Sequence, residues 1–368
     1  MKISYVNGIC LKNDAISTAI SREIEALQEL EGVSVRLYAY ACDYSHLPFQ
    51  KVNDVSDVAF DEYFQCSDLV VFHFGVYSPL FNLLAMTPQR AKRLVVFHNI
   101  TPKQFLPAES HDLINKSVMQ MSNIVWADHV ICVSETNLQV LRDANINTPA
   151  SVLPLSVILP IVPKTTKPSF TDNILRIVFL GRFVMSKGPN ELLDALEVLL
   201  KQGGQPKIRV DMVGNFLFSD QQLLEKVREQ ANILNQIYKD NVQIFIRGNI
   251  TDKEKQQVLD DADLFVLPTY HEGFCVPVLE ALASGCQVVI YDNSNTPAIS
   301  GGLAILVPTG DILQLADAIS NTLKKVCSLD WETVGYRAAC EDSYQYVQQF
   351  SPQQIKQQFV DFITNFTS

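Results

Sequence analysis

The sequence contains none of the short motifs that mark a zinc site or a redox dithiol. Its eight cysteines have no CxxC spacing, and no HxxxH or HExxH pattern occurs among the six histidines. Neither a bound metal nor dithiol chemistry is therefore expected. Cys132 in VICVS and Cys286 in SGCQVVI lie inside apolar runs and are predicted to be small buried side chains. Reduced thiols of this kind are typical of a cytoplasmic protein.

Long hydrophobic runs and an excess of positive charge are also missing. No apolar run approaches the roughly 20 residues of a membrane span, and the start, MKISYVNGICLKND, turns polar after about ten residues, unlike a signal peptide. The 29 Lys and Arg residues are outnumbered by 40 Asp and Glu residues, which gives a net charge of −11. Nucleic acid is therefore not expected as a partner, because phosphate binding needs a basic face.

Short apolar runs alternate with amphipathic stretches along both halves of the chain. The first half contains ISYV, VSVRLYAY, DLVVFHF, RLVVFHN, DHVICVS and ASVLPL, and the second contains RIVFLG, RVDMVGN, VQIFIRG, DLFVLP, CQVVIY and AILVP. This alternation predicts βαβ units and mainly parallel sheets. Prolines gather at and just before residues 157–173, beside threonines and lysines, a composition typical of an interdomain linker.

With 368 residues, of which 47% are hydrophobic, the chain is long enough for two domains. We predict an α/β protein with two Rossmann-like domains, residues 1–160 and 161–349, and a further helix at 350–368. Ligands of such sheets bind beyond the carboxyl ends of the strands. A cleft between facing domains is therefore the expected site.

LGRFVMSKG, residues 180–188, places two cations where a strand ends. Arg182 and Lys187 directly follow the predicted strand RIVFL. Cations at the carboxyl end of a strand suit an anionic ligand. An ordinary solvated loop explains the same pattern equally well when the motif is taken alone.

HEGFCVPVLEALASG, residues 271–285, follows another predicted strand. Pro277 is placed for the first turn of a helix that ends at Gly285, so the loop can turn its N–H groups toward a phosphate. Glu272 and Glu280 can accept hydrogen bonds from sugar or ribose hydroxyls. The alternative is a helix whose acidic residues only complement its dipole.

In the first half, RLVVFHNITP places His98 and Asn99 directly after a hydrophobic strand. A histidine there can donate to a ligand oxygen, although a structural histidine explains the pattern as well. His73 in VVFHFG has a corresponding but weaker position. Gly8 follows the first strand and would let the chain pass close to a ligand, although no GxGxxG motif is present there.

Together these motifs resemble the retaining glycosyltransferases of family 4, which have the GT-B fold. The resemblance depends on the E-x7-E spacing of Glu272 and Glu280 with GRFVMSKG upstream, and it covers nearly the whole chain. FHNITP is similar to the family's histidine loop, WADHVICVSE to its strand before the linker, and DADLFVLPTYHEGF to its donor loop. It also implies that the terminal helix at 350–368 crosses back to the N-terminal domain.

The resemblance implies a role for each matching position. Arg182 and Lys187 match the pair that neutralises the donor diphosphate. Glu272 matches the carboxylate near the donor sugar's hydroxyls, and Glu280 matches the acceptor of hydrogen bonds from the ribose. His98 matches the histidine that contacts the transferring sugar. The implied catalytic residues are His98, Glu272, Arg182 and Lys187.

The backbone of the donor loop and the base-reading loop are implied in the same way. The amides of Gly273, Phe274 and Cys275 match the backbone that approaches sugar and phosphate, and Arg247 and Asn249 in IFIRGN lie where the family reads the base. The residues expected to bind substrate are Gly8, Asn99, Arg182, Lys187, Arg247, Asn249, Glu272, Gly273, Phe274, Cys275 and Glu280.

Two positions depart from the family pattern. The family often has a Gly-Gly pair after its first strand, where this chain has the single Gly8. It commonly has glycine where Cys275 stands, so backbone freedom in the donor loop is reduced. Neither departure removes a charged group.

Family 4 enzymes transfer a sugar from a nucleoside diphosphate to an acceptor hydroxyl with retention of configuration. The resemblance implies hexosyl transfer without a metal or cofactor, in keeping with the lack of a DxD motif in a plausible loop. The donor favoured by the family is UDP-glucose, with GDP-mannose next. A saccharide or a lipid-linked saccharide is the expected acceptor, in exopolysaccharide or glycolipid assembly.

Two alternative functions stay open. A nucleotide-sugar epimerase of the same fold would give product without an acceptor. A catalytically silent nucleotide-sugar-binding subunit would lack donor turnover.

The basic PQRAKR stretch, residues 88–93, suits either a weak peripheral contact with the inner face of a membrane or a solvated loop, and the solvated loop is commoner.

Overall fold

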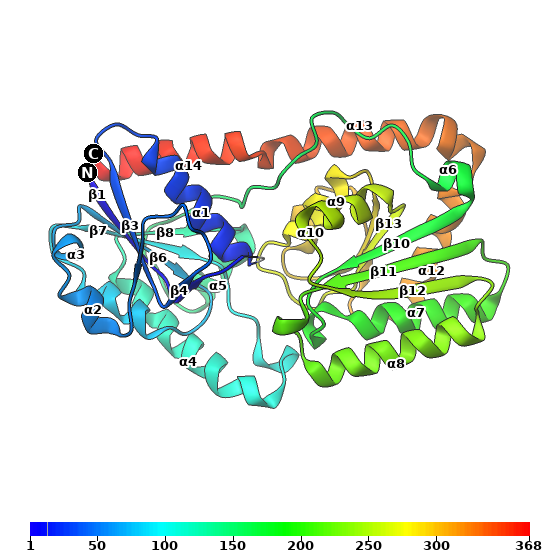
Figure 1. Cartoon of the computed structure of the whole chain (residues 1–368), viewed down its shortest axis with the longest axis horizontal. Helices are drawn as coiled ribbons and strands as arrows, with labels where there is room; N and C mark the ends of the chain where they lie inside the picture. Colours follow the sequence, from blue (N-terminus) through cyan, green and yellow to red (C-terminus); the bar gives the residue numbers. More distant parts are fainter. Residues whose placement is uncertain (13) are drawn as a thin grey trace. The chain divides into compact units, whose positions relative to one another are not determined.

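The computed structural model describes residues 1–12 and 14–368, and the chain divides into two compact units (Figure 1). The first unit comprises Met1–Lys103, Ala108–Ser156 and Phe350–Ser368, and the second comprises Gln104–Pro107 and Val157–Gln349. Each unit has its own parallel sheet with helices packed against it, which confirms the predicted α/β fold class.

The first unit is built on a seven-stranded parallel sheet. Its strand order is β5-β3-β1-β6-β7-β8-β9. The central strand β6 is buried at all six positions, as expected of a strand covered on both faces. The strands are β1 (Lys2–Val6), β3 (Ser34–Ala39), β5 (Phe49–Lys51), β6 (Leu69–Phe74), β7 (Lys92–Phe97), β8 (His129–Cys132) and β9 (Ala150–Val152), with a separate pair β2 (Ile9–Cys10) and β4 (Ala41–Cys42).

Helices of the first unit begin at short polar side chains that satisfy free backbone N–H groups. Asp14 accepts from the Ser17 N–H at the start of α1, and Ser134 accepts from the Asn137 N–H at the start of α5. The helices are α1 (Ala15–Gln28), α2 (Val55–Ala59), α3 (Glu62–Gln65), α4 (His111–Met121), α5 (Glu135–Asp143) and α14 (Pro352–Thr367), with the 3-10 helices η1 (Pro79–Met86), η3 (Ala108–Ser110) and η4 (Ser122–Trp126). The 3-10 helix η2 (Lys103–Phe105) begins at the last residue of the first segment, and its other two residues belong to the second unit.

The C-terminal helix α14 packs against α1 of the first unit. Ile355, Phe359 and Ile363 recur at spacings of four residues and are buried on one face of the helix. The His129 ring lies 5.0 Å from the Phe362 ring, centroid to centroid. Burial of this apolar stripe ties the last segment of the chain to the first sheet's unit.

The second unit contains a six-stranded parallel sheet with the order β12-β11-β10-β13-β14-β15. The strands are β10 (Ile174–Leu180), β11 (Lys207–Gly214), β12 (Val242–Gly248), β13 (Leu264–Leu267), β14 (Gln287–Asp292) and β15 (Ala304–Pro308). The helices are α6 (Ser169–Asp172), α7 (Pro189–Gln202), α8 (Gln221–Ile237), α9 (Asp252–Asp261), α10 (Val276–Ala283), α11 (Thr296–Ser300), α12 (Ile312–Val326) and α13 (Tyr336–Val347), with η5 (Met185–Lys187), η6 (Phe216–Phe218), η7 (Trp331–Gly335) and η8 (Gln348–Phe350).

Several local predictions are confirmed. All twelve apolar runs expected to be strands contain one, and α10 ends just before Gly285, whose φ is +73°. Cys132 and Cys286 are buried, at 0% and 1% exposure. All eight cysteines belong to the described residues and are free thiols.

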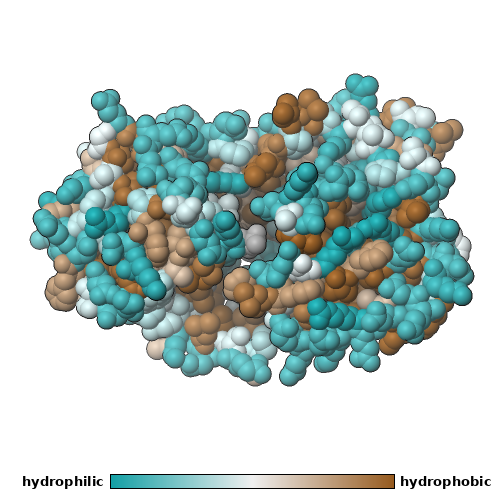
Figure 2. Space-filling view, in the orientation of Figure 1, coloured by the Kyte–Doolittle hydropathy of each residue, from teal (hydrophilic) through white to brown (hydrophobic). Residues whose placement is uncertain are grey.

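No helix among residues 1–12 and 14–368 is long and apolar enough to cross a membrane. On the face shown in Figure 2, hydrophilic residues cover most of the surface, and hydrophobic residues form smaller groups between them.

Residues 157–173, expected to be a linker, contain a buried lysine that is bonded into the second unit. Lys167 is only 2% exposed, and its Nζ donates at 2.9 Å to the carbonyl oxygens of both Asp260 and Ser284. These carbonyls lie at the ends of α9 and α10, where unpaired carbonyls favour a cation. This segment therefore has the composition of a linker, but Lys167 anchors it to the second unit.

Replacing Lys167 with methionine should destabilise the second unit by about 2–4 kcal/mol, because buried carbonyls would lose their donor. Urea unfolding of Lys167→Met measures this. Lys201→Met is the control, since Lys201 is an exposed lysine on α7 whose replacement should change stability by less than about 0.5 kcal/mol. Equal effects of the two substitutions would contradict an anchoring role for Lys167.

Candidate functional site

Two loops of the second unit follow the carboxyl ends of β10 and β13 and touch each other at Gly188. Gly188 has φ +63°, and a Cβ built on it would lie 2.1 Å from the Pro268 carbonyl oxygen. Ser186 O accepts hydrogen bonds from Thr269 Oγ1 at 2.9 Å and from the Tyr270 N–H at 2.8 Å. Glycine at 188 is therefore needed for the two loops to approach this closely.

This approach brings two of the predicted site residues into contact. Lys187 Nζ lies 2.6 Å from Glu272 Oε1, and the two side chains are only 19% and 7% exposed. Arg182, at the start of the first loop, is exposed and has no ion pair with any described residue. The edge of the sheet thus presents one cation that is neutralised by a carboxylate and one that is open to an anion.

Helix α10 begins beside this pair. Pro277 has no N–H, and the Val278 N–H donates to the Cys275 carbonyl at 3.2 Å, so Val276 holds the remaining N–H of the first three helical residues. Its N-cap, Cys275, has φ +82°, and within the described chain no side chain caps the helix. An N-terminus of this kind attracts an anion through its N–H groups and the helix dipole. The positive φ of Cys275 is the conformation that glycine adopts more readily, in line with the noted departure at this position. Burial, followed by the Glu272 charge, raises the pKa of the Cys275 thiol well above its usual value.

The second glutamate of the E-x7-E pair also has a cation as its partner. Glu280 Oε1 on α10 accepts from Lys255 Nζ on α9 at 2.8 Å, and the two side chains are 18% and 29% exposed. Lys255 did not enter the sequence interpretation, because it lies 25 residues from Glu280 in an ordinary charged helix. No sequence signal marks such a pair.

Arg247 at the end of β12 is held by a buried carboxylate. Its Nε lies 2.5 Å from Asp211 Oδ1 on the neighbouring strand β11, and Asp211 is 5% exposed. Arg209 Nε bonds the other oxygen of the same carboxylate at 2.8 Å. Asn249, two residues further, is exposed with φ +50°. Of the two residues predicted to read the base, Arg247 is therefore held by Asp211, and Asn249 is exposed.

Two further polar atoms beside these loops are buried without a hydrogen bond to any described residue. They are His271 Nε2, next to Glu272, and Asn190 Oδ1 in the first turn of α7. Buried polar atoms of this kind usually have a partner, so each is a candidate ligand contact. Neither His271 nor Asn190 was among the residues predicted from the sequence to bind substrate.

In the first unit, the loop after β7 is held rigidly. His98 donates its backbone N–H to Phe74 O at 2.8 Å, and Asn99 has φ +73°. The Asn99 side chain is 7% exposed and donates to Asn137 Oδ1 at 3.0 Å. Asn99, predicted to bind substrate, is thus engaged in fixing the turn that carries His98. Its contact with a ligand stays a prediction.

Gly8 lies against the hydroxyl of Ser78. A Cβ built on Gly8 would lie 3.3 Å from Ser78 Oγ, and that buried oxygen has no hydrogen bond to a described residue. The loop from 8 to 15 includes Asn13, which is outside the described residues. The small residue at 8 therefore permits a close approach of two loops.

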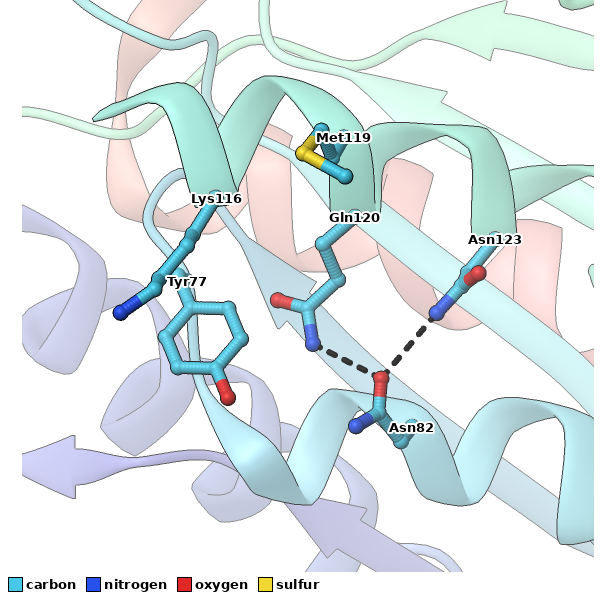
Figure 3. A pocket seen from close by; sticks show the side chains of 6 residues that line it. All are labelled: Tyr77, Asn82, Lys116, Met119, Gln120 and Asn123. Carbon is cyan, nitrogen blue, oxygen red and sulfur yellow. Dashed lines mark hydrogen bonds between the residues drawn. The ribbon is translucent and has the colours of Figure 1, made fainter. Parts of the chain in front are cut away.

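A hollow of about 250 Å³ opens on the first unit between η1 and α4 (Figure 3). At its floor Asn82 Oδ1 accepts from Gln120 Nε2 at 2.9 Å and from Asn123 Nδ2 at 3.2 Å. The Tyr77 ring and the Lys116 side chain lie on one side of these amides in Figure 3. An aromatic ring beside amides is suited to a ligand with hydroxyl groups.

Among residues 1–12 and 14–368, no group of three or more His, Cys, Asp or Glu side chains is arranged to hold a metal ion.

Comparison with known proteins identifies the second unit's relatives. Residues 165–329, just under half of the chain, match the family model described as "Glycosyl transferases group 1". Mannosylfructose-phosphate synthase of Agrobacterium fabrum (strain C58 / ATCC 33970) is 29% identical over 144 residues, which are 38% of this chain and 29% of that protein. 2-Deoxystreptamine N-acetyl-D-glucosaminyltransferase of Niallia circulans is 29% identical over 143 residues, which are 38% of this chain and 34% of that protein.

The chain thus spans about a third of the length of these curated relatives. Among solved structures, Anabaena HepE in complex with UDP-glucose superimposes with a TM-score of 0.74 at 16% identity, covering 99% of this chain and 100% of that chain. The fold is therefore GT-B. In sequence the second unit is similar to group 1 glycosyltransferases.

The contact at Gly188 makes a testable prediction. Gly188→Ala should destabilise the chain by roughly 3 kcal/mol or more, because it adds a clash to the strain of a left-handed alanine. Gly32→Ala is the matched control, since Gly32 has φ +73° in a turn but no described atom within 4 Å of its Cβ position. It should show the conformational strain alone, roughly 1–2 kcal/mol. Urea unfolding measures the loss of unfolding free energy in both variants. Equal losses would refute the contact.

Buried histidines predict that stability depends on pH. Burial lowers the pKa of His271 and His129 below 6.5, and burial with the neighbouring His73 lowers that of His98 well below it. The unfolded chain therefore binds more protons than the folded chain below pH 6.5. Stability should be fully present above this value and fall with pH until the lowered pKa values are reached, by up to about 1.4 kcal/mol per pH unit for each histidine.

Urea unfolding between about pH 7.5 and pH 5.5 tests this dependence. His98→Gln should reduce the slope, and His46→Gln, at a half-exposed histidine, is the control. A slope that His98→Gln does not alter would show that His98 does not stay neutral in the folded chain.

Proposed function

We propose that this chain is a retaining glycosyltransferase of family 4 that moves a hexose from a nucleoside diphosphate to an acceptor hydroxyl. The observation that carries the proposal is the meeting of Lys187, Glu272 and the uncapped N-terminus of α10 at one edge of the second sheet. A cation, a hydrogen-bond acceptor and free N–H groups are what a sugar diphosphate needs. The match of residues 165–329 to group 1 glycosyltransferases supports the same assignment.

The leaving diphosphate develops negative charge during transfer. Arg182, Lys187 and the N–H groups at the start of α10 would stabilise that charge. Because protein cations fill this role, the proposed reaction needs neither a metal nor a cofactor, and EDTA should leave its rate unchanged. We assign no covalent nucleophile. The acceptor attacks on the face the diphosphate leaves, and its hydroxyl proton passes to the leaving phosphate.

The nucleoside would lie along the same edge of the second unit. Glu280, oriented by Lys255, would accept from the ribose hydroxyls, and Arg247 and Asn249 would approach the base. Glu272 and the loop of Gly273, Phe274 and Cys275 would approach the sugar and phosphates. Since HepE binds UDP-glucose on the same fold, UDP-glucose is the donor we propose, with GDP-mannose next.

The acceptor would bind the first unit. The Tyr77 and Lys116 side chains at its hollow and the loops that carry Gly8, Ser78 and His98 would offer hydrogen bonds to hydroxyl groups. We propose a saccharide or lipid-linked saccharide as acceptor, in polysaccharide or glycolipid assembly. The free thiols suit a cytoplasmic enzyme, and Arg90, Lys92 and Arg93 would provide its weak contact with the inner face of a membrane.

Release of nucleoside diphosphate from UDP-glucose and GDP-mannose, measured with a panel of oligosaccharide acceptors, tests the proposal. Arg182→Ala and Lys187→Ala should each lower the transfer rate by roughly 10²–10³, as removal of one charge-stabilising donor does. Arg182 is exposed, so its replacement leaves the fold intact. Lys201→Ala, an exposed lysine on α7, should match the unmodified chain. Turnover of either site variant at the unmodified rate would refute the diphosphate assignment.

A further inference from the structure

Three side chains from separate elements of the first unit form a line of hydrogen bonds that ends at His98. Glu23 on α1 lies 3.0 Å from His73 Nε2, and His73 Nδ1 on β6 lies 2.8 Å from His98 Nε2. The Tyr5 hydroxyl on β1 donates to the same Glu23 oxygen at 3.1 Å. The side chains of His73 and Glu23 are 1% and 15% exposed, so the line is largely shielded from water.

The positions of the protons follow from the chemistry of each group. An ionised carboxylate only accepts, so the proton between Glu23 and His73 belongs to His73 Nε2. With its single ring proton held on Nε2 by the carboxylate, His73 keeps a lone pair on Nδ1. The proton between the two rings therefore belongs to His98 Nε2. His98 Nδ1 then carries the remaining lone pair, and it has no hydrogen bond to any described residue.

We propose that Glu23 and His73 are positioning residues that fix the tautomer of His98, so that its Nδ1 accepts a hydrogen bond from a ligand hydroxyl. From its place after a hydrophobic strand, His98 was predicted to donate a hydrogen bond to a ligand oxygen. With the proton on Nε2, His98 would instead accept a hydrogen bond from the ligand. The inference rests on the proposed function only for the identity of that hydroxyl, which would be one of the transferring sugar.

Burial supports this arrangement of protons. Burial and the neighbouring His73 lower the pKa of His98 well below 6.5, so its ring stays neutral near neutral pH. Burial and then the Glu23 charge raise the pKa of Tyr5 well above 10.0, so its hydroxyl remains a donor. The titratable groups that face His73 are Glu23 from α1, Tyr5 from β1 and His98 from the loop after β7.

The backbone holds the His98 ring in register with His73. The two rings lie nearly in one plane, with centroids 5.1 Å apart and planes at 21°, as expected of rings joined edge to edge by the 2.8 Å bond. A Cβ built on Gly75 would lie 3.3 Å from the His98 Cβ, so Gly75 leaves room for the ring. Asn99, bonded to Asn137, fixes the turn that follows. The hydrogen bond between the rings is therefore set by the fold and does not require a ligand.

The ring-nitrogen spectrum of the full chain, labelled with ¹⁵N-histidine, tests the tautomer directly. With six histidines the spectrum is small, and loss of one set of signals in His98→Gln assigns His98. We expect a neutral His98 with its proton on Nε2. A neutral His98 with its proton on Nδ1, or a cationic ring at neutral pH, would overturn the proposal.

Glu23→Met tests the part played by the carboxylate. Glu23→Gln would keep a carbonyl oxygen where Tyr5 and His73 both donate, so Glu23→Met, which has no acceptor oxygen, is the informative variant. With no acceptor holding its proton on Nε2, His73 should no longer fix the bond to His98, and we expect part of the His98 population to carry its proton on Nδ1. Glu25→Met is the matched control, because Glu25 also lies on α1 and pairs with a histidine, His46, at 2.8 Å, but it is exposed. An unchanged His98 spectrum in Glu23→Met would overturn the positioning role.

These spectra need no donor, acceptor or turnover. A chain that failed to transfer a sugar would refute the proposed function and leave the tautomer result standing. A chain that transferred sugar with the proton of His98 on Nδ1 would refute only the positioning role of Glu23 and His73.

Discussion

Gly188 lies so close to the Pro268 carbonyl that a side chain would not fit there, and this contact sets the distance between the two loops that carry the candidate donor site. The bonds from Thr269 and Tyr270 to Ser186 lock the same contact. Because both loops follow buried parallel strands, their positions are fixed by the sheet. The Lys187–Glu272 pair and the start of α10 then follow from the backbone.

The acids of the site are already paired with cations before any ligand binds. Glu272 has Lys187 and Glu280 has Lys255 as partner. One buried and one partly buried carboxylate near the start of α10 would otherwise repel the proposed diphosphate. Each lysine offsets one negative charge, and the exposed Arg182 adds an unpaired one. A bound diphosphate would compete with Glu272 for Lys187, so that the ion pair becomes part of the binding equilibrium.

The first unit organises His98 by a different means. Its partners are a buried histidine, a carboxylate and an asparagine turn, and they come from α1, β6 and α5. In our proposal these contacts determine which ring nitrogen of His98 accepts a hydrogen bond. The candidate site residues of each unit are thus held by contacts within that unit that do not depend on a ligand.

Sequence patterns predicted the strands and the helix that ends before Gly285, and they singled out Glu272, Glu280 and Lys187 as candidates, because these depend on local periodicity, turn residues and spacing. Patterns could not predict Lys255, whose partner is 25 residues away, or Glu23, whose partner His73 is 50 residues away. Such pairs form when distant segments pack together, and no periodicity in the sequence marks them.

The linker interpretation of residues 157–173 depends on composition alone. Prolines, threonines and lysines have the same composition in a flexible segment and in an anchored one, and only the tertiary structure shows that Lys167 is buried against helix ends. The segment also contains the short helix α6, so composition predicted neither its contacts nor its helix. Pairing of buried polar groups is the information that a single sequence lacks.

A crystal structure of the chain with UDP is the most direct test of the donor site. We predict a diphosphate at the start of α10, with Arg182 and Lys187 bonded to its oxygens. The distance from Lys187 Nζ to Glu272 should be longer than in the unliganded chain, or the bond broken. We also predict that Glu280 contacts the ribose. A diphosphate bound elsewhere, or an unchanged Lys187–Glu272 pair beside an empty helix end, would contradict this prediction.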